Sequence, residues 1–270
     1  MNKKQATFIK TVWECYERHG RRSLPWRKTN FPYRILVSEI MLQQTQVDRV
    51  LPKYKSFLER FPSVRILASA SLGDVLREWQ GLGYNRRAKM LHGAAQAIVK
   101  EHAGRFPKKY AELLALPGVG SYTAGAVLAF AHNTPIPIIE TNIRTVYLHH
   151  FFEDATDVAD SDVLTLVIET LDLENPRDWY YALMDYGSHL KRKIGNPNSR
   201  SKQYAVQSTF KGSDREIRGG IIRTLSHTRM TRLKLHKILP FEPQRIDAQL
   251  ERLQEEEMII NKRGIYSLPD

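Results

Sequence analysis

Glu39 opens the run EIMLQQTQV, residues 39 to 47, which otherwise has the apolar spacing of a buried helix. A carboxyl group held among apolar side chains binds its proton more tightly than one in water, so it can donate that proton to a departing group. Ile40 and the earlier Trp26 are expected to supply such surroundings. The plainer interpretation is an acid that caps a helix or lies at the surface. Gln43 and Gln44 raise a second question, because a packing helix would carry leucines there.

A glycine-rich turn is the second candidate for chemistry. In LPGVGSYTAGAVLAFA, residues 116 to 131, a tight turn separates two segments with helical spacing. Glycines let backbone N–H groups approach a ligand closely, and the following helix presents its positive N-terminus to it. A phosphate suits such a site, and the groups that would hold it belong to Gly118, Val119, Gly120 and Ser121. The hairpin could thus grip a nucleic-acid backbone without reading its sequence; a plain helix–helix turn is the alternative.

Helices must position these residues, because apolar side chains recur at helical spacing and little in the first 200 residues alternates like a strand. The fold class is therefore all-α. SLPWRKTNFPY, residues 23 to 33, is predicted to be a loop, and Pro52 to restart a helix in its first turn. Helices are predicted at residues 4–19, 34–50, 72–79, 86–102, 108–115, 121–132, 141–151, 160–171 and 176–189.

Composition favours a folded protein with a polyanionic partner. The 270 residues are 42% hydrophobic, and a formal charge of +12 with a pI near 9.7 is typical of nucleic-acid binding, although a basic surface without function has the same totals. No stretch is long and apolar enough to cross a bilayer, and the N-terminus lacks a signal sequence, so a soluble intracellular protein is expected. Cys15 is the one cysteine, which excludes an internal disulfide or a cysteine-ligated metal centre.

The last 60 residues differ in character from the rest. Residues 191–207 form a polar linker, and three short helices and a hairpin at Lys262-Arg263-Gly264 then predict a winged-helix module. Such modules bind DNA or proteins. Acidic residues on the third helix, Glu251 and Glu255 among them, argue against that helix lying wholly in a groove. Arg215 and Arg218 are candidates for DNA contact, but the preferred interpretation is that both are simply solvated.

Four segments together resemble a known family. LPGVGSYTA is similar to the helix-hairpin-helix of the base-excision DNA glycosylases, the superfamily that includes endonuclease III. Within it, LPWR, SEIMLQQTQV, GLGYNRRAKMLHGAAQ and LPGVGSYTAGAV resemble, in order and spacing, the adenine DNA glycosylases of the MutY type. The resemblance covers roughly residues 5 to 190, and MLQQTQV together with GLGY is specific to that branch.

The resemblance implies a role for each matching residue. Glu39 would be the general acid that protonates the purine, Gln44 would wedge into the base stack, and Tyr84 would insert on the opposite strand. Gln43 and Gln44 would then face DNA rather than a core. Trp26 and Arg27 would wall the pocket for the flipped base, which must leave the duplex because its glycosidic bond is inaccessible there. Trp26 could instead be an ordinary core aromatic.

Two further positions decide the expected chemistry. Tyr122 falls where bifunctional relatives carry the lysine of a Schiff base, so a monofunctional enzyme that leaves an abasic site is expected. In PIIETNIRTV, Glu140 takes the place of the family's aspartate that stabilises or attacks the oxocarbenium sugar, and Asn142 follows it. Glutamate keeps the charge but reaches about one methylene further, and an error near 1 Å can cost about 100-fold in rate. The alternative for Glu140 is an acid that only caps a helix.

Two departures from the family concern parts of the chain rather than single residues. Met184-Asp185-Tyr186-Gly187 keeps the lead-in to an iron–sulfur cluster, but the four cysteines are missing, so no cluster and no other metal is expected, with a monovalent cation at the hairpin left open. Lys191, Arg192, Lys193 and Arg200 there either meet phosphates or face solvent. The C-terminal module is too short for the family's oxidised-nucleotide-hydrolase-like domain, so recognition of 8-oxoguanine has no support in the sequence.

These observations predict a monomeric, cytoplasmic or otherwise intracellular DNA glycosylase without strong lyase activity. It would remove a mispaired base, adenine opposite 8-oxoguanine or G, from double-stranded DNA and would not bind membranes. A thymine or uracil glycosylase acting at G mismatches and a non-catalytic mismatch-binding protein are the alternatives. The predicted domains are residues 1–24 with 136–207, residues 25–135 carrying the helix-hairpin-helix, and residues 208–270, with the active site in the cleft between the first two.

Overall fold

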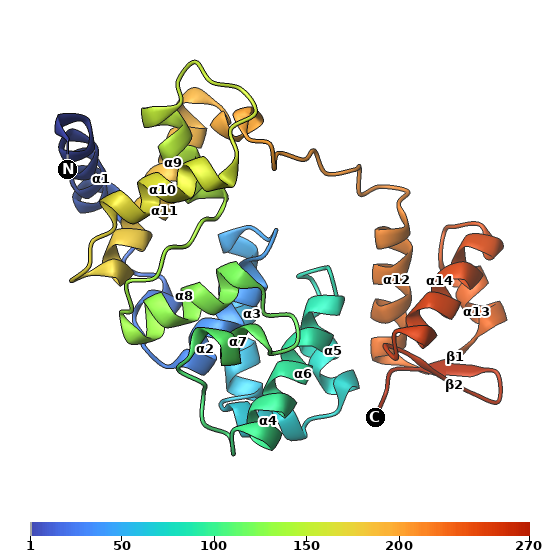
Figure 1. The fold of residues 1–270 in the computed structure, drawn as a ribbon. Helices are drawn as coiled ribbons and strands as arrows, with labels where there is room; N and C mark the ends of the chain where they lie inside the picture. The colour runs from blue at the N-terminus through green and yellow to red at the C-terminus, as the bar shows by residue number, and fades with distance from the viewer. Residues whose placement is uncertain (1) are drawn as a thin grey trace. The chain divides into compact units, whose positions relative to one another are not determined.

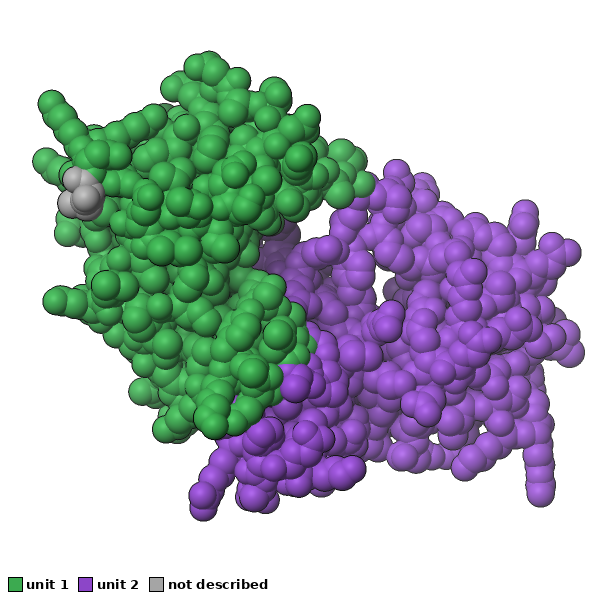
Figure 2. Space-filling model, viewed as in Figure 1, with its two compact units in different colours: residues 1–36, 108–114, 119–206 green, residues 37–107, 115–118, 207–270 purple. Residues whose placement is uncertain are grey.

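The computed structural model describes residues 2–270, which fold mostly into helices (Figure 1). The predicted all-α class is confirmed. Two compact units divide the chain (Figure 2). Unit 1 comprises residues 1–36, 108–114 and 119–206, and unit 2 comprises residues 37–107, 115–118 and 207–270. Helix α2 (Pro32–Leu42) begins in unit 1 and ends in unit 2.

Unit 1 is built around an aromatic core. Phe8 of the first helix packs against Tyr147 and Trp179, with ring centroids 5.1 and 6.1 Å apart, and all three side chains are fully buried. Aromatic side chains of this size bury much apolar area, which joins the N-terminal helix to helices from the second half of the chain. The elements are α1 (Lys3–His19), η1 (Pro25–Arg27), α7 (Tyr110–Leu114), α8 (Ser121–His132), α9 (Thr141–Phe151), α10 (Asp160–Thr170), α11 (Pro176–Ile194) and η2 (Pro197–Arg200).

Unit 2 contains a second aromatic core and the C-terminal module. Phe57 packs edge-on against Phe61 and Trp79, at centroid distances of 4.9 and 5.9 Å. The helices before the module are α3 (Val47–Arg60), α4 (Val64–Ser69), α5 (Leu72–Glu78) and α6 (Arg86–Glu101). The module follows with α12 (Asp214–His227), β1 (Met230–Thr231), α13 (Arg232–Ile238), α14 (Pro243–Glu255), β2 (Ile260–Lys262) and β3 (Ile265–Ser267).

The C-terminal module has the three helices and the hairpin that were predicted. Arg263 and Gly264 form the two-residue turn between β2 and β3, both with positive φ, which is the backbone that a tight hairpin needs. The structure adds β1, which was not predicted and pairs antiparallel with β3, giving the sheet order β1-β3-β2. Two residues are too short a run for alternation to be visible in sequence.

Several predicted helix limits were wrong. The helix expected at residues 34–50 is two helices, because α2 ends at Leu42 and Gln44 takes a left-handed backbone with φ of 55°. Pro52 lies inside α3 instead of restarting a helix. Helix α4 was missed, and α11 continues to Ile194. None of the helices in the described residues has both the length and the apolar character of a membrane span.

The C-terminal module packs onto helices α5 and α6 within unit 2. The backbone N–H of Gly73 donates to the carbonyl of Pro269 at 2.8 Å, and Lys89 Nζ lies 2.9 Å from Glu257 Oε2. A Cβ atom at Gly73 would stand 2.4 Å from the Pro269 oxygen, so only glycine allows this approach. The last residues of the chain are thereby tied to the body of unit 2.

Candidate active site

Glu39 lies in the last turn of α2, and only 7% of it is exposed. The flanking Ser38 and Ile40 are buried as well. Glu39 is therefore a buried acid near the C-terminal end of a helix. A surface or capping acid, the plainer interpretation of Glu39, does not fit its place inside a buried helix.

Arg87, at the start of α6, holds the end of α2 in place. Its Nη1 donates to the carbonyls of Ile40, Met41 and Gln43 at 2.8, 2.9 and 2.5 Å. These carbonyls lack partners inside the helix because α2 ends there. Nη2 donates to Thr45 Oγ1 at 3.0 Å and to the Gly83 carbonyl at 3.1 Å. One guanidinium therefore fixes both the loop after α2 and the loop before α6.

These two loops carry the residues that the resemblance assigns to DNA insertion. Gln44 and Tyr84 both have left-handed backbones, with φ of 55° and 46°, and both are exposed. The Tyr84 ring lies 5.5 Å from the guanidinium of Arg87, within range of a cation–π contact. Non-glycine residues adopt this backbone at a cost of about 1–3 kcal/mol, which is typical of functional positions. The insertion loops are thus preformed, with Gln43 leading into them at the end of α2.

The glycine turn joins α7 to α8 as a helix-hairpin-helix. Gly118 has φ of 72°, and a Cβ atom there would stand 2.4 Å from Met90 Cβ. Val119 is buried and anchors the turn. Gly120 is the N-cap of α8, and a Cβ atom there would meet no other atom within 4 Å. Ser121, the first residue of α8, is exposed. An anion is the ligand that this terminus favours.

Glu140 is the N-cap of α9. Its Oε1 accepts the backbone N–H groups of Asn142 and Ile143 at 2.7 and 2.9 Å, and its Oε2 accepts the Asn142 side-chain amide at 3.2 Å. The glutamate side chain folds back to reach these donors, so its extra methylene is taken up locally. The structure therefore shows the capping role for Glu140.

Helix α11 packs closely against the start of α9. A Cβ atom at Gly187 would stand 2.2 Å from the Asn142 carbonyl oxygen, so only glycine allows α11 to approach the start of α9. One turn later, Lys191 Nζ donates to Asn142 Oδ1 at 3.0 Å. Burial lowers the pKa of Lys191, while the charge of Glu140 acts in the opposite direction. Lys191 thus positions Asn142 rather than facing solvent.

Asp185 lies on α11 and pairs with the predicted pocket residue Arg27. The carboxylate receives Arg27 Nη1 and Nη2 at 2.6 and 2.9 Å, and Arg21 Nε at 2.6 Å. Its side chain is 2% exposed and that of Arg27 is 5% exposed. Burial would raise the pKa of Asp185, but the hydrogen bonds and charges of the two arginines outweigh burial and hold it below its usual value. Trp26 is buried next to Arg27 in η1.

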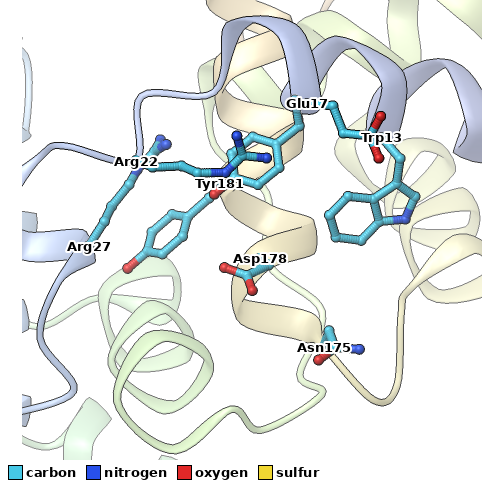
Figure 3. Close-up of a pocket in the computed structure, with 8 residues that line it drawn as sticks. Trp13, Glu17, Arg22, Arg27, Asn175, Asp178 and Tyr181 are labelled. Atoms are coloured by element: carbon cyan, nitrogen blue, oxygen red, sulfur yellow. The ribbon is translucent and has the colours of Figure 1, made fainter.

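An open pocket of about 440 Å³ lies in unit 1 beside Arg27 (Figure 3). Trp13 and Glu17 come from α1, Arg22 and Arg27 from the segment after it, and Tyr181 from α11. The Arg27 guanidinium lies 4.5 Å from the centre of the Tyr181 ring. Arg27 is therefore held by a carboxylate and an aromatic face, which leaves this side chain little freedom to move.

The loop after α11 is held by hydrogen bonds. Asn198 is 3% exposed and donates to the Thr141 carbonyl and to Thr145 Oγ1, at 3.1 and 2.5 Å. Ser201 forms an isolated parallel bridge with Val158. Cys15, the chain's one cysteine, lies on α1, so these residues do not fit a cysteine-ligated cluster. Among residues 2–270, no three His, Cys, Asp or Glu side chains are grouped as a metal site would require.

The basic residues after α11 have different roles. Lys191 binds Asn142, and Arg200 Nη1 donates to the Phe152 carbonyl at 2.8 Å, whereas Arg192 and Lys193 are exposed. In the C-terminal module, Arg218 forms an ion pair with Glu256 at 2.6 Å, so it is not simply solvated as the sequence suggested.

The structure brings some predicted site residues together within each unit. Glu140 and Asn142 are in contact in unit 1, to which Trp26, Arg27 and Tyr122 also belong. Glu39, Gln43, Gln44 and Tyr84 belong to unit 2. Arg87 and Asp185 were missed as functional residues. Both lie inside quoted motifs, GLGYNRRAK and Met184–Gly187, and an arginine or aspartate on a buried helix face was the available signal.

The fold and these residues define a class of DNA repair protein. Residues 37–163 match the model of the HhH-GPD superfamily base excision DNA repair proteins. The structure of a thermostable thymine-DNA glycosylase matches with a TM-score of 0.63 at 26% identity, covering 69% of this chain and 87% of that one.

Two relatives narrow the family. The adenine DNA glycosylase of Mycolicibacterium smegmatis is 36% identical over 260 residues, which is 87% of each chain. That of Buchnera aphidicola subsp. Baizongia pistaciae is 36% identical over 182 residues, and the match covers 67% of this chain but 52% of the relative. The chain belongs to the HhH-GPD superfamily and, within it, to the family of the adenine DNA glycosylases.

Proposed function

We propose that the protein is a monofunctional DNA glycosylase of base excision repair that removes adenine mispaired with G or 8-oxoguanine. The observation that carries this proposal is the buried carboxyl of Glu39 in the last turn of α2. That helix ends two residues before the exposed Gln44. An acid buried next to duplex-inserting residues can protonate a base that has left the duplex. The family's adenine-excising members support the same substrate.

In this proposal two carboxyl groups have different roles in the reaction. Glu39 transfers its proton to a ring nitrogen of the extruded adenine, and the glycosidic bond breaks with its electron pair leaving on the base. The sugar becomes an oxocarbenium ion, which the anionic Glu140 stabilises. Water then adds at the anomeric carbon and loses a proton, which restores the acid form of Glu39, and adenine and an abasic site are the products. Trp26 and Arg27, the latter fixed by Asp185, wall the base pocket.

Double-stranded DNA is the partner, and the binding groups divide into two kinds. Gly118, Val119, Gly120 and Ser121 grip a phosphate with backbone N–H groups, which carries no sequence preference. Gln43, Gln44 and Tyr84 act on the base stack instead. The enzyme works as an intracellular monomer. It uses no iron–sulfur cluster, and the hydrogen bonds of Asn198 support the loop after α11 instead.

Absence of a lyase step is the second part of the proposal. Tyr122 occupies the position of the Schiff-base lysine and offers a phenol instead of an amine. Borohydride should therefore trap no protein–DNA adduct at a rate that approaches base release. Adduct formation as fast as excision would refute this part while leaving the glycosylase intact.

A set of mispaired duplexes tests the function directly. The protein is incubated with duplexes carrying A, T or U opposite G or 8-oxoguanine, and alkali then cleaves any abasic site. Strand breaks only at A support the proposal, whereas breaks at T or U would make the enzyme a pyrimidine glycosylase. Tight mismatch binding without any break would identify a non-catalytic binding protein.

Glu39→Gln tests the acid itself. The amide keeps the size of the side chain but has no proton to give, so base release should fall at least 100-fold while DNA affinity stays within about twofold. Glu59→Gln, at an exposed position on α3, is the matched control and should retain full activity. Unchanged single-turnover excision by Glu39→Gln would reject Glu39 as the general acid.

A further inference from the structure

The segment that leads into the C-terminal module contacts both insertion residues. Gln207 Nε2 donates to Gln44 Oε1 at 2.6 Å and also to the hydroxyl of Tyr84. Arg215 Nη1 donates to the same hydroxyl at 2.6 Å, and its guanidinium lies 5.7 Å from the centre of the Tyr84 ring. Tyr84 therefore has cationic groups of both Arg87 and Arg215 within cation–π range.

Arg215 is held in place by its own surroundings. Its Nη2 donates to the Ser208 carbonyl and Oγ at 2.5 and 3.1 Å. The Gly212 N–H binds Glu216 Oε2 at 2.6 Å, and Arg245 Nη2 binds the Gly212 carbonyl at 2.9 Å. These bonds close the loop at the start of α12, so Arg215 projects from an ordered element rather than from a free linker. Such preorganisation reduces the entropy that binding must offset.

Gln207 and Arg215 must accompany the insertion residues when DNA binds. If Gln44 and Tyr84 enter the duplex, Gln207 and Arg215, which are hydrogen-bonded to them, come close to the broken base pair. The base left behind there has an unpaired edge with donors and acceptors. Arginine offers a planar fork that matches the O6 and N7 acceptors of guanine. Glutamine offers one donor and one acceptor, which match O6 and the N7–H of 8-oxoguanine.

We propose that Gln207 and Arg215 recognise the base opposite the excised adenine, which the proposed function gives as G or 8-oxoguanine. The proposal rests on the function argued above and adds its specificity determinant. In the DNA complex, Gln207 and Arg215 release Gln44 Oε1 and the Tyr84 hydroxyl. They bind instead the O6 and N7 edge of the purine that has lost its partner. Arg218, one turn along α12, is committed to Glu256 and takes no part.

Binding to a product analogue tests this without any catalysis. Duplexes carry a tetrahydrofuran abasic site opposite G, 8-oxoguanine, C or T, and fluorescence anisotropy measures each Kd for the full-length chain. The wild type should prefer the two purines. In Arg215→Ala and Gln207→Ala the ratio of pyrimidine to purine Kd should fall at least tenfold, because tight purine binding is lost. Arg223→Ala, on an exposed face of the same helix, should leave this ratio unchanged.

Two other results would overturn the inference. Equal weakening on all four duplexes, with a salt slope smaller by about one, would make Arg215 a phosphate contact. Equal tightening on all four would make the segment a strap that covers the insertion residues. Arg215→Lys separates charge from shape, since lysine keeps the charge but lacks the fork, and it should lose selectivity like Arg215→Ala. Circular dichroism confirms that each variant is folded.

Failure of the proposed function would look different. A wild type that releases no base but prefers purines opposite the abasic site would remove the glycosylase and keep the recognition. A wild type that excises adenine while both variants retain its purine preference would remove the recognition alone.

Discussion

Three carboxylates of this chain show how the surroundings of a residue decide its chemistry. Glu39 is buried near the C-terminal end of α2, where the proposed function makes it the proton donor. Glu140 accepts hydrogen bonds from the start of α9 and caps that helix. Asp185 accepts hydrogen bonds from two arginines and fixes Arg27. Residue type alone does not distinguish these roles; the groups around each carboxylate do.

Asp185→Asn should be among the more destabilising single changes in unit 1. It leaves Arg27 buried without a counter-charge, and removing one partner of a buried pair costs about 3–5 kcal/mol. Urea unfolding at pH 7 measures the loss in the free energy of unfolding. Asp214→Asn, whose ion pair with Arg245 is half exposed, should lose about 0.5 kcal/mol or less. Equal losses in both variants would show that the Arg27 pair contributes nothing special.

The same residue predicts a pH dependence. Because the pKa of Asp185 is lower in the folded state, its stabilisation is complete above the unfolded pKa of about 3.9 and is lost as pH falls through the folded pKa. The wild type should therefore lose more stability than Asp185→Asn between pH 5 and pH 2. Unfolding free energies at intervals across this range provide the measurement, and parallel curves for the two proteins would contradict the expectation.

At the scale of elements, the loops that carry function are fixed by groups on neighbouring helices. Arg87 of α6 holds the end of α2, and the hairpin between α7 and α8 depends on a glycine packed against Met90. Each loop departs from regular backbone at the residue predicted to meet DNA. Rigid helices thereby place exposed, strained residues with little freedom, which is the condition for precise binding.

Arg87→Lys should loosen both insertion loops. Arg87 binds the carbonyl of Leu82 besides the four carbonyls named above. A lysine has three donors instead of a planar fork, so several of these five carbonyls would lose their partner, at about 1–3 kcal/mol for each one left buried. We expect the free energy of unfolding to fall by about 2–4 kcal/mol and mismatch affinity to fall at least tenfold. Arg86→Lys, exposed at the neighbouring position, should change neither quantity. If Arg87→Lys is as stable as the wild type but binds DNA weakly, Arg87 positions the loops without stabilising the fold.

The two glycines of the hairpin should respond differently to alanine. Gly118→Ala forces a left-handed backbone and a clash with Met90, so it should cost about 2–4 kcal/mol of stability. Gly120→Ala meets open space and a normal backbone, so stability should change by about 0.5 kcal/mol or less. Its new methyl group stands in the approach to the α8 N-terminus, and DNA affinity should fall severalfold. Unchanged DNA affinity in Gly120→Ala would place the phosphate elsewhere.

At the scale of the whole molecule, the C-terminal module is part of unit 2 and not a loosely attached tail. Its last residues bind α5 through Gly73, its Glu257 pairs with Lys89 of α6, and its first helix carries Arg215 to Tyr84. The module is therefore docked at three points on the part of unit 2 that carries Gln44 and Tyr84. Glu256, the C-cap residue after α14, forms an ion pair with Arg218 inside the module.

Gly73→Val should undock the module. The new side chain would collide with the Pro269 carbonyl and Leu268, so the C-terminal contact must open. Limited proteolysis should then cleave near residues 202–212 at least tenfold faster than in the wild type. Gly219→Ala, where a Cβ meets nothing within 4 Å, is the control and should be cleaved at the wild-type rate. Equal cleavage of all three proteins would mean that the module is not held through α5.

Much of this protein could be predicted from sequence because local signals are strong. Helical spacing, the glycine turn and the hairpin at Arg263-Gly264 are properties of short segments, and MLQQTQV with GLGY was enough to identify the family. The break between α2 and α3 was missed, because the four polar residues between them, 43–46, also fit a solvated helix face. The predicted domain limits and the predicted cleft remain predictions.

Only the tertiary structure decided which polar residues support the site. Arg87, Asp185 and Asn198 are far in sequence from the groups they bind, so no local pattern identifies their partners. The same holds for Gln207 and Arg215, whose contacts with Gln44 and Tyr84 span more than a hundred residues of chain. Sequence determined the helices and the chemistry available to them. Packing determined where the charges are buried, and burial gives each carboxyl and guanidinium its role.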